Sequence, residues 1–141
     1  MRQICESGAG KMRIHHFGFI TDNLRGGGIF TLLGFVPEGD VVFDRERKIQ
    51  VLFMKKQGIR IELVVPDGEE SPFYPLIGKY KNSFYHICYE TEDIRKEMIM
   101  LRGKGFVQTT RIQPAPAIGG RNVVFLLNPQ IGLIELLETK K

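Results

Sequence analysis

The chain has 141 residues, of which 43% are hydrophobic and 26% charged, and this composition suits a compact folded domain rather than a disordered chain. Its net charge is only +4, and its aromatic residues lie in apolar stretches rather than in a basic stripe, which argues against nucleic-acid binding. No apolar stretch approaches the roughly 20 residues that a membrane-spanning helix needs, so we expect no membrane insertion.

The first twelve residues predict a loose tail, because residues 1–11 lack the apolar run of a signal peptide. Cys5 lies in this polar tail and Cys88 in an apolar run. Two cysteines in such different surroundings do not make a disulfide framework, and they favour a reducing, cytoplasmic setting.

A first structural unit is predicted over residues 13–66. Residues 13–20 alternate as a strand and residues 22–33 are expected to be helical. Strands rich in Val, Ile and Phe are expected at 35–43, 47–55 and 58–65. The glycines 26–28 carry neither a phosphate-loop nor a dinucleotide-binding pattern. Each costs a helix about 1 kcal/mol relative to alanine, so we expect a frayed first helix that starts near Gly28, away from any site.

A connection rich in Pro, Gly and Ser is predicted over residues 67–83, with one helical turn at 73–79. A second unit, residues 84–138, repeats the order of the first. Asp93 is expected to cap its helix, which glycine and basic residues end. The elements expected in this unit are a strand at 84–90, a helix at 94–104 and strands near 106–111, 121–127 and 131–138.

The two units share matching landmarks in the same order, which indicates a duplicated module. "HFGFITDNL" begins at His16 and "HICYETEDI" begins at His86, and each stretch is followed by a Gly-Phe pair. Each unit then closes with Ile-Glu-Leu, which places Glu62 in the first and Glu135 in the second.

These two histidines and two glutamates stand in apolar strands. Taken singly, such a residue is more often an ordinary half-buried or solvated side chain. A carboxylate between apolar neighbours, as in "GLIELLE", nevertheless needs a partner. Strand alternation puts His16 on one face with Gly18, and His15 on the other face. The matching positions favour a single metal ion held by His16, Glu62, His86 and Glu135.

This order of residues on βαβββ modules resembles the vicinal-oxygen-chelate superfamily, which includes glyoxalase I and methylmalonyl-CoA epimerase. The stretches that carry the resemblance are "HHFGFI", "IELVVP", "SPFYPLIGKYKNSFYHICYETEDI", "PAPAIGGRNVVFLLNP" and "GLIELLE". The resemblance implies an α+β fold in which a single domain, residues 13–138, forms a curved mixed sheet around a metal-binding cleft. It also implies that the first ligand is His16, before Phe17-Gly18, and that His15 packs on the helix side.

The chemistry that the resemblance implies is proton transfer at a carbon next to a carbonyl or thioester. One divalent ion (Ni, Co, Zn, Mn or Fe) would act as Lewis acid for a thioester or hemithioacetal substrate. Glu135 would be the base, with Glu62 on the opposite side. Gln50 and Arg121 are candidate substrate contacts, and the loop 113–121 would close over the site. The resemblance further implies a homodimer.

Three functions stay open at this point. The short ending "NPQIGLIEL" favours a lactoylglutathione lyase of the glyoxalase I type. The middle segment, "SPFYPLIGKYKNSFYHICYE", favours a methylmalonyl-CoA epimerase. A non-catalytic protein that binds an antibiotic is the third, although members of that kind lack the metal ligands.

Overall fold

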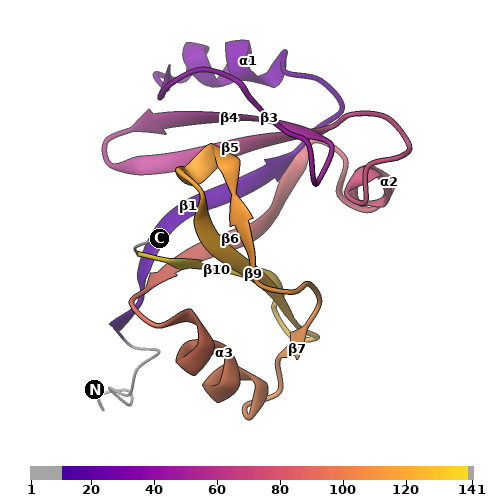
Figure 1. Cartoon of the computed structure of the whole chain (residues 1–141). Helices are drawn as coiled ribbons and strands as arrows, with labels where there is room; N and C mark the ends of the chain where they lie inside the picture. The colour runs from indigo at the N-terminus through magenta and orange to yellow at the C-terminus, as the bar shows by residue number, and fades with distance from the viewer. Residues whose placement is uncertain (1–10, 140–141) are drawn as a thin grey trace.

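The computed structural model describes residues 11–139, and Figure 1 shows them as one α+β fold around a mixed sheet. Residues 1–10, which contain most of the expected tail and Cys5, lie outside the described residues. None of the helices in the described part is long and apolar enough to cross a membrane.

The first unit follows the predicted order, except that the strand expected at 35–43 is split in two. Gly39, with φ +88°, lies between the two short pieces and turns the chain where other residues would be strained. The elements are β1 (Arg13–Ile20), α1 (Gly26–Leu32), β2 (Val36–Pro37), β3 (Val42–Asp44), β4 (Ile49–Lys56) and β5 (Ile59–Pro66).

The connection holds α2 (Tyr74–Tyr80), at the place where one helical turn was expected. The second unit adds a short strand that the sequence did not predict, followed by a 3-10 turn. Its elements are β6 (Ser83–Thr91), α3 (Ile94–Arg102), β7 (Val107–Gln108), β8 (Gln113–Ala115), η2 (Pro116–Ile118), β9 (Arg121–Asn128) and β10 (Gly132–Glu138).

The sheet runs in the order β2-β4-β5-β1-β6-β10-β9-β7, with β3 beside β4 and β8 beside β9. The two units meet in its middle, where β1 and β6 pair antiparallel. On either side of this pair the partners are parallel, β5 beside β1 and β10 beside β6. The arrangement is therefore close to two-fold symmetric about the β1–β6 contact.

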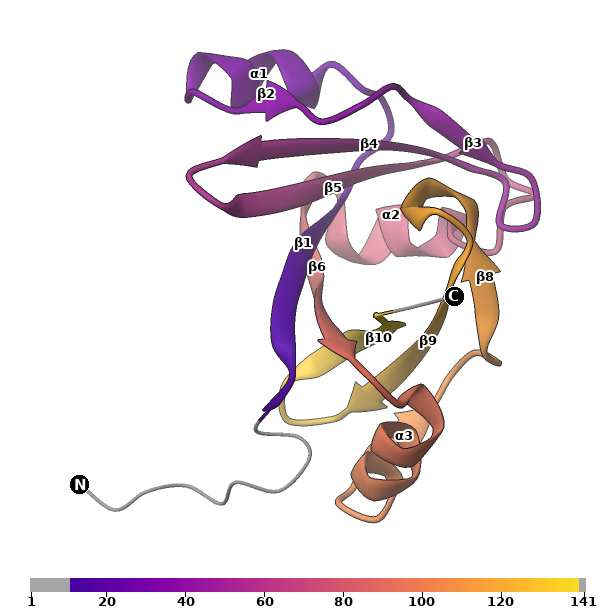
Figure 2. The same ribbon diagram turned by 60° about the vertical axis from the view of Figure 1, so that its left-hand side comes forward.

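Helices cover the outer side of each half of the curved sheet (Figures 1 and 2). Buried Met54 and Leu63 form the core beneath α1, and α3 inserts Met98 and Leu101 against Val124 and its neighbours in β9 and β10. The concave side has its own apolar cluster, which α2 and η2 cover. The predicted cap of α3 is confirmed, because the Asp93 carboxylate accepts a hydrogen bond from the Lys96 amide at 3.1 Å.

The glycines of α1 differ from expectation in where the helix starts. It begins at Gly26 rather than near Gly28, and Gly27 packs against the sheet, where an added Cβ would lie 3.5 Å from Leu63 Cδ1. Gly26 and Gly28 face open space. The helix lies on the outer side of the sheet, as expected (Figure 2).

Candidate metal centre

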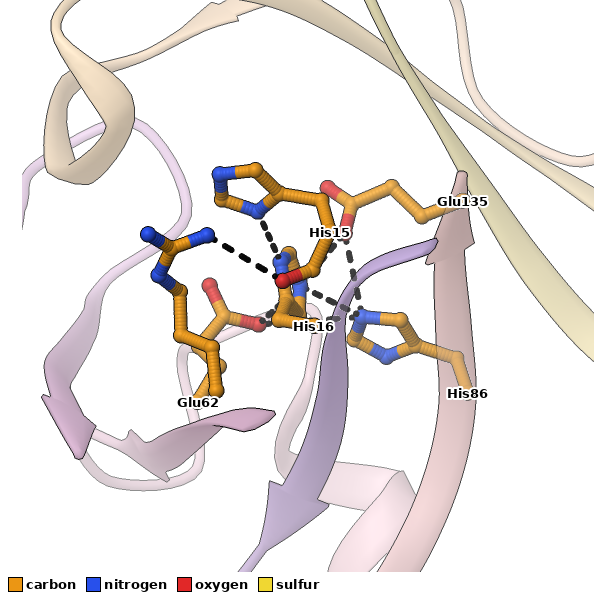
Figure 3. Close-up of polar contacts among 6 residues, drawn as sticks. His15, His16, Glu62, His86 and Glu135 are labelled. Carbon is orange, nitrogen blue, oxygen red and sulfur yellow. Dashed lines mark hydrogen bonds and ion pairs between the residues drawn. The ribbon is translucent and has the colours of Figure 1, made fainter. Parts of the chain in front are cut away.

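Four buried side chains meet on the concave side of the sheet (Figure 3). His16 comes from β1, Glu62 from β5, His86 from β6 and Glu135 from β10, so the central four strands supply one each. None of these residues is more than 7% exposed. The structure thus brings together the four residues that the sequence singled out as a set.

Their donor atoms are spaced as ligands of one ion are spaced. His16 Nε2 lies 3.2 Å from Glu62 Oε1 and 3.1 Å from Glu135 Oε1. His86 Nε2 lies 3.7 Å and 3.0 Å from the same two oxygens, and the two Nε2 atoms are 3.3 Å apart. Ligands about 2.1 Å from an ion are separated by about 3.0 Å at right angles and about 3.4 Å in a tetrahedron.

One of the carboxylate oxygens that face the histidines is left without a hydrogen bond in the described part of the chain. Glu135 Oε1 is buried and makes no hydrogen bond among the described residues, although two imidazole nitrogens lie within 3.1 Å of it. A buried acceptor of this kind needs a partner, and an ion between the four donors would provide one. The spacing and the set of two imidazoles and two carboxylates therefore fit a divalent ion of borderline softness.

The site carries an excess of negative charge. Burial disfavours the charged form of His16, but the Glu62 carboxylate outweighs it and holds the pKa of His16 well above its ordinary value. Burial likewise disfavours an ionised Glu135, yet the adjacent imidazoles of His16 and His86 lower the pKa of its carboxyl. A proton on His16 offsets part of this negative charge, and a bound dication would replace that proton.

A β-bulge in β1 lies directly before the first of these histidines. Ile14 is opposite Tyr89 and His16 is opposite Cys88, so His15 is an extra residue on its strand. The prediction that His15 packs on the helix side is therefore wrong, because strict alternation stops at the bulge. Its ring instead lies edge-on to His16, with centroids 5.1 Å apart. Burial, with His16 and Arg60 close by, lowers the pKa of His15 to about 4.

A second bulge occupies the matching place in β6. Gly18 is opposite His86 while Phe19 is opposite Phe84, which leaves Tyr85 as the extra residue. Tyr85 joins the buried cluster of the concave side, with its ring 4.5 Å from that of His86. Phe84 is turned to the outer side, where it packs on Phe19, and it does not share a face with His86.

Gly18 leaves the space that the His86 ring occupies. A Cβ added to Gly18 would lie 2.1 Å from His86 Cε1 and 2.3 Å from its Nδ1. These distances are far inside van der Waals contact, so a side chain at this position would displace the imidazole. Gly18 in the first unit therefore makes room for His86, the histidine of the second unit.

Comparison with protein families agrees with this geometry. The family model of the Glyoxalase/Bleomycin resistance protein/Dioxygenase superfamily matches residues 15–125. The chain belongs to this superfamily. The resemblance inferred from the repeat is thereby confirmed at the level of the superfamily and its fold. No curated protein is significantly similar to the chain in sequence.

Solved structures with a similar fold align with nearly the whole chain. A hypothetical protein from Bacillus halodurans C-125 has a TM-score of 0.79 at 22% identity, over 93% of this chain and 96% of its own. The methylmalonyl-CoA epimerase from Mycobacterium tuberculosis has a TM-score of 0.75 at 18% identity, over 91% and 88%. A Streptomyces coelicolor methylmalonyl-CoA epimerase variant in complex with 2-nitronate-propionyl-CoA has a TM-score of 0.72 at 22% identity, over 89% and 93%.

A narrow, mostly apolar cavity adjoins the four-residue cluster. Its volume is about 20 Å³, room for about one water molecule. Glu62 and Glu135 line it, and Ala117 and Ile118 of the η2 segment form part of its wall. The loop that was expected to close over the site does cover this cavity. The other lining residues are Asp44, Arg47, Ile49, Val51, Val64, Phe73, Tyr85, Ala115, Val123 and Phe125.

An ion pair in the cavity wall was missed from the sequence. Asp44 is 3% exposed, and its Oδ2 accepts a hydrogen bond from Arg47 Nη1 at 2.7 Å. The same Nη1 donates to the carbonyl oxygen of Pro114 at 3.1 Å, which ties β3 to β8. "FDRERK" reads as an exposed charged turn, and only the packing of the η2 segment over it creates the burial.

The remaining candidates lie apart from the cluster. Gln50 alternates with Ile49 and Val51, which line the cavity, so its side chain is on the outer face of β4. Arg121 is paired with the Glu90 carboxylate and donates from Nε to the Glu138 carbonyl at 2.8 Å. Cys88 is fully buried, and burial, with Glu135 beside it, raises the pKa of its thiol, as suits a packing residue.

Proposed function

We propose that the protein is a divalent-metal-dependent enzyme that moves a proton at a carbon next to a carbonyl or thioester. The observation that carries the proposal is the meeting of four buried donor atoms beside a mostly apolar cavity, with each histidine Nε2 3.0–3.7 Å from both carboxylates. The cavity has room for about one water molecule, which suits an open coordination position beside the ion.

The proposed roles follow from the position of each side chain. His16, Glu62, His86 and Glu135 hold the ion, which when bound supplies Lewis-acid stabilisation of an enolate-like oxygen. The two glutamates come from β5 and β10, the outer two of the four central strands, so they flank the histidines from opposite sides. One takes the proton from the substrate carbon and the other can return it from the other side. We assign the first role to Glu135, as the resemblance to the superfamily implies.

The reaction that we propose to test first is epimerisation of an acyl thioester of the methylmalonyl-CoA type. Several of the structural neighbours are methylmalonyl-CoA epimerases, one of them in complex with 2-nitronate-propionyl-CoA. The middle segment of the chain resembles the same enzymes. Carboxylates on both sides of a carbon also suit inversion of that carbon.

A glyoxalase I reaction is the second candidate, because the chain between β9 and β10 is short. In this turn the Asn128 side chain accepts a hydrogen bond from the Gln130 amide at 2.9 Å. Epimerases that the sequence otherwise resembles carry an insertion at this place. A metal-free binding protein is the third candidate, and metal content distinguishes it from the two enzymes.

The decisive experiment starts with metal content. The purified protein is expected to contain or take up one divalent ion per chain, measured by inductively coupled plasma mass spectrometry. The variant His86→Ala is expected to stay folded but to lose this ion. The loaded protein is then given methylmalonyl-CoA in D₂O, and separately methylglyoxal with glutathione or a bacterial thiol. Deuterium at the α-carbon supports the epimerase, and a lactoyl thioester supports the glyoxalase.

Matched amide variants test the base. Glu135→Gln is expected to lower turnover by about 100-fold or more, the usual contribution of a positioned general base. Glu69→Gln makes the same chemical change at an exposed position and is expected to leave turnover unchanged. Metal-loaded protein that performs neither reaction would refute both enzyme assignments, and a chain that binds no divalent ion would favour the binding protein.

A further inference from the structure

The bulge residue His15 makes a direct contact with a proposed metal ligand. Its Nδ1 lies 2.8 Å from Nδ1 of His16, within hydrogen-bond distance. His16 turns its other nitrogen, Nε2, toward the two glutamates. The four-residue cluster therefore extends through the His16 ring to a third imidazole, that of His15 (Figure 3).

The direction of this hydrogen bond follows from the ligand role of His16. A histidine that binds an ion through Nε2 must carry its proton on Nδ1, and that proton needs an acceptor. The acceptor at 2.8 Å is His15 Nδ1, so His15 would carry its own proton on Nε2. If His15 Nδ1 donated instead, neutral His16 would carry its proton on Nε2. That proton would occupy the position at which the ion binds.

The backbone of the bulge is held independently of this contact. Arg60 Nη1 donates to the carbonyl oxygen of His15 at 3.2 Å. The same guanidinium binds both carboxylate oxygens of Glu38, with Nε–Oε1 2.7 Å and Nη2–Oε2 3.1 Å. Such a two-pronged pair fixes the orientation of the guanidinium, and with it the carbonyl that the bulge displaces. The ring of Phe53, 6.2 Å away between centroids, borders the His15 ring.

The second unit positions its histidine in another way. His86 Nδ1 is buried and has no hydrogen-bond acceptor in the part of the chain that the structure describes. The ring instead lies over Gly18 and against Tyr85 and Phe125. Packing thus orients His86, whereas a hydrogen bond orients His16.

We propose that His15 is a positioning residue that holds His16 in the tautomer and orientation in which Nε2 faces the ion. This proposal rests on the proposed function, because it takes His16 as a ligand. Side-chain partners of this kind are typically worth a factor of about 10–100 in metal affinity.

The test compares two substitutions of His15 in the full chain. His15→Leu removes the acceptor, whereas His15→Asn keeps one, because its Oδ1 is as many bonds from the backbone as His Nδ1. Zn²⁺ affinity, measured by competition with a chelator, is expected to fall about 10–100-fold in His15→Leu and to stay within a few-fold of wild type in His15→Asn. Thermal unfolding of each metal-free variant shows whether the fold is kept.

A spectroscopic measurement separates the hydrogen bond from a general effect on packing. In ¹⁵N NMR of the Zn²⁺-loaded wild type, His16 Nδ1 is expected to carry a slowly exchanging proton and His15 Nδ1 to carry none. Equal affinities of wild type and His15→Leu, or an equal loss in His15→Asn and His15→Leu, would overturn the proposal. Loaded protein without either enzymatic activity would refute the proposed reaction and leave the role of His15 standing.

Discussion

Replacing Gly18 with alanine is expected to displace His86 from the proposed metal centre. The new Cβ would lie 2.1 Å from Cε1 of the His86 ring and 2.7 Å from its Nε2. Carbon atoms in contact are about 3.5–4.0 Å apart, so the ring would have to retreat by about 1.4 Å or more. Because the clash is with a buried ring rather than with the end of a flexible side chain, small adjustments cannot absorb it.

The displacement is larger than a metal site tolerates. Metal–ligand distances are held to about 0.2 Å, so a ring that has moved by more than 1 Å no longer coordinates the ion. We expect Gly18→Ala to weaken metal affinity by at least about 100-fold, beyond the loss of a supporting contact. Overpacking is also expected to lower the free energy of unfolding of the metal-free protein by about 1–3 kcal/mol.

Zn²⁺ competition and urea unfolding in a chelator measure the two effects separately. Gly28→Ala is the matched control, because nothing lies within 4 Å of an added Cβ there and the residue is inside α1. This control should keep wild-type affinity and gain about 0.5–1 kcal/mol of stability. Wild-type metal affinity in Gly18→Ala would show that the His86 ring is not held against Gly18, and the reasoning about the site would fail.

Two further predictions concern buried charges away from the ligands. Burial raises the pKa of Glu97, so its ionised form destabilises the folded state above its ordinary pKa and this penalty vanishes in acid. Glu97→Gln should therefore raise the free energy of unfolding at pH 7 and raise it less near pH 3, measured by urea titration at the two pH values. Arg47→Met leaves the buried Asp44 carboxylate unpaired and should cost about 3 kcal/mol. Lys48→Met removes an exposed pair and should cost less than about 1 kcal/mol; equal losses in the two variants would contradict this account of the cavity wall.

The sequence was sufficient to predict the two units and the set of four polar residues, because each unit supplied a check on the other. His16 and His86 are unremarkable singly, and so are Glu62 and Glu135. Their shared place in a repeat made them one set, and the antiparallel contact of β1 with β6 brings them together. The α1 boundary was less certain, since three glycines weaken a helix that packing at Gly27 then supports.

The sequence failed where a feature depends on pairing between distant segments. A bulge is a property of two strands in register, so no pattern within "RIHHFGFI" shows that His15 is the extra residue. Alternation therefore assigned the wrong side to His15. Asp44 and Arg47 were missed for a similar reason, because residues of the far unit bury them.

The pairing of β1 with β6 also explains why the two histidines are supported differently. His16 is opposite Cys88 and His86 is opposite Gly18, so each histidine faces the residue two positions after the histidine of the other unit. The duplication thus builds the same contact twice, with a thiol on one side and no side chain on the other. At Gly18 the ring of His86 can lie directly on the backbone, and packing alone orients it. At Cys88 a side chain occupies the corresponding space. The His16 ring has a hydrogen-bond partner in His15, the bulge residue that precedes it. Each unit has a bulge residue directly before its histidine, and the two residues act differently: His15 contacts His16 through a hydrogen bond, whereas Tyr85 packs its ring against that of His86.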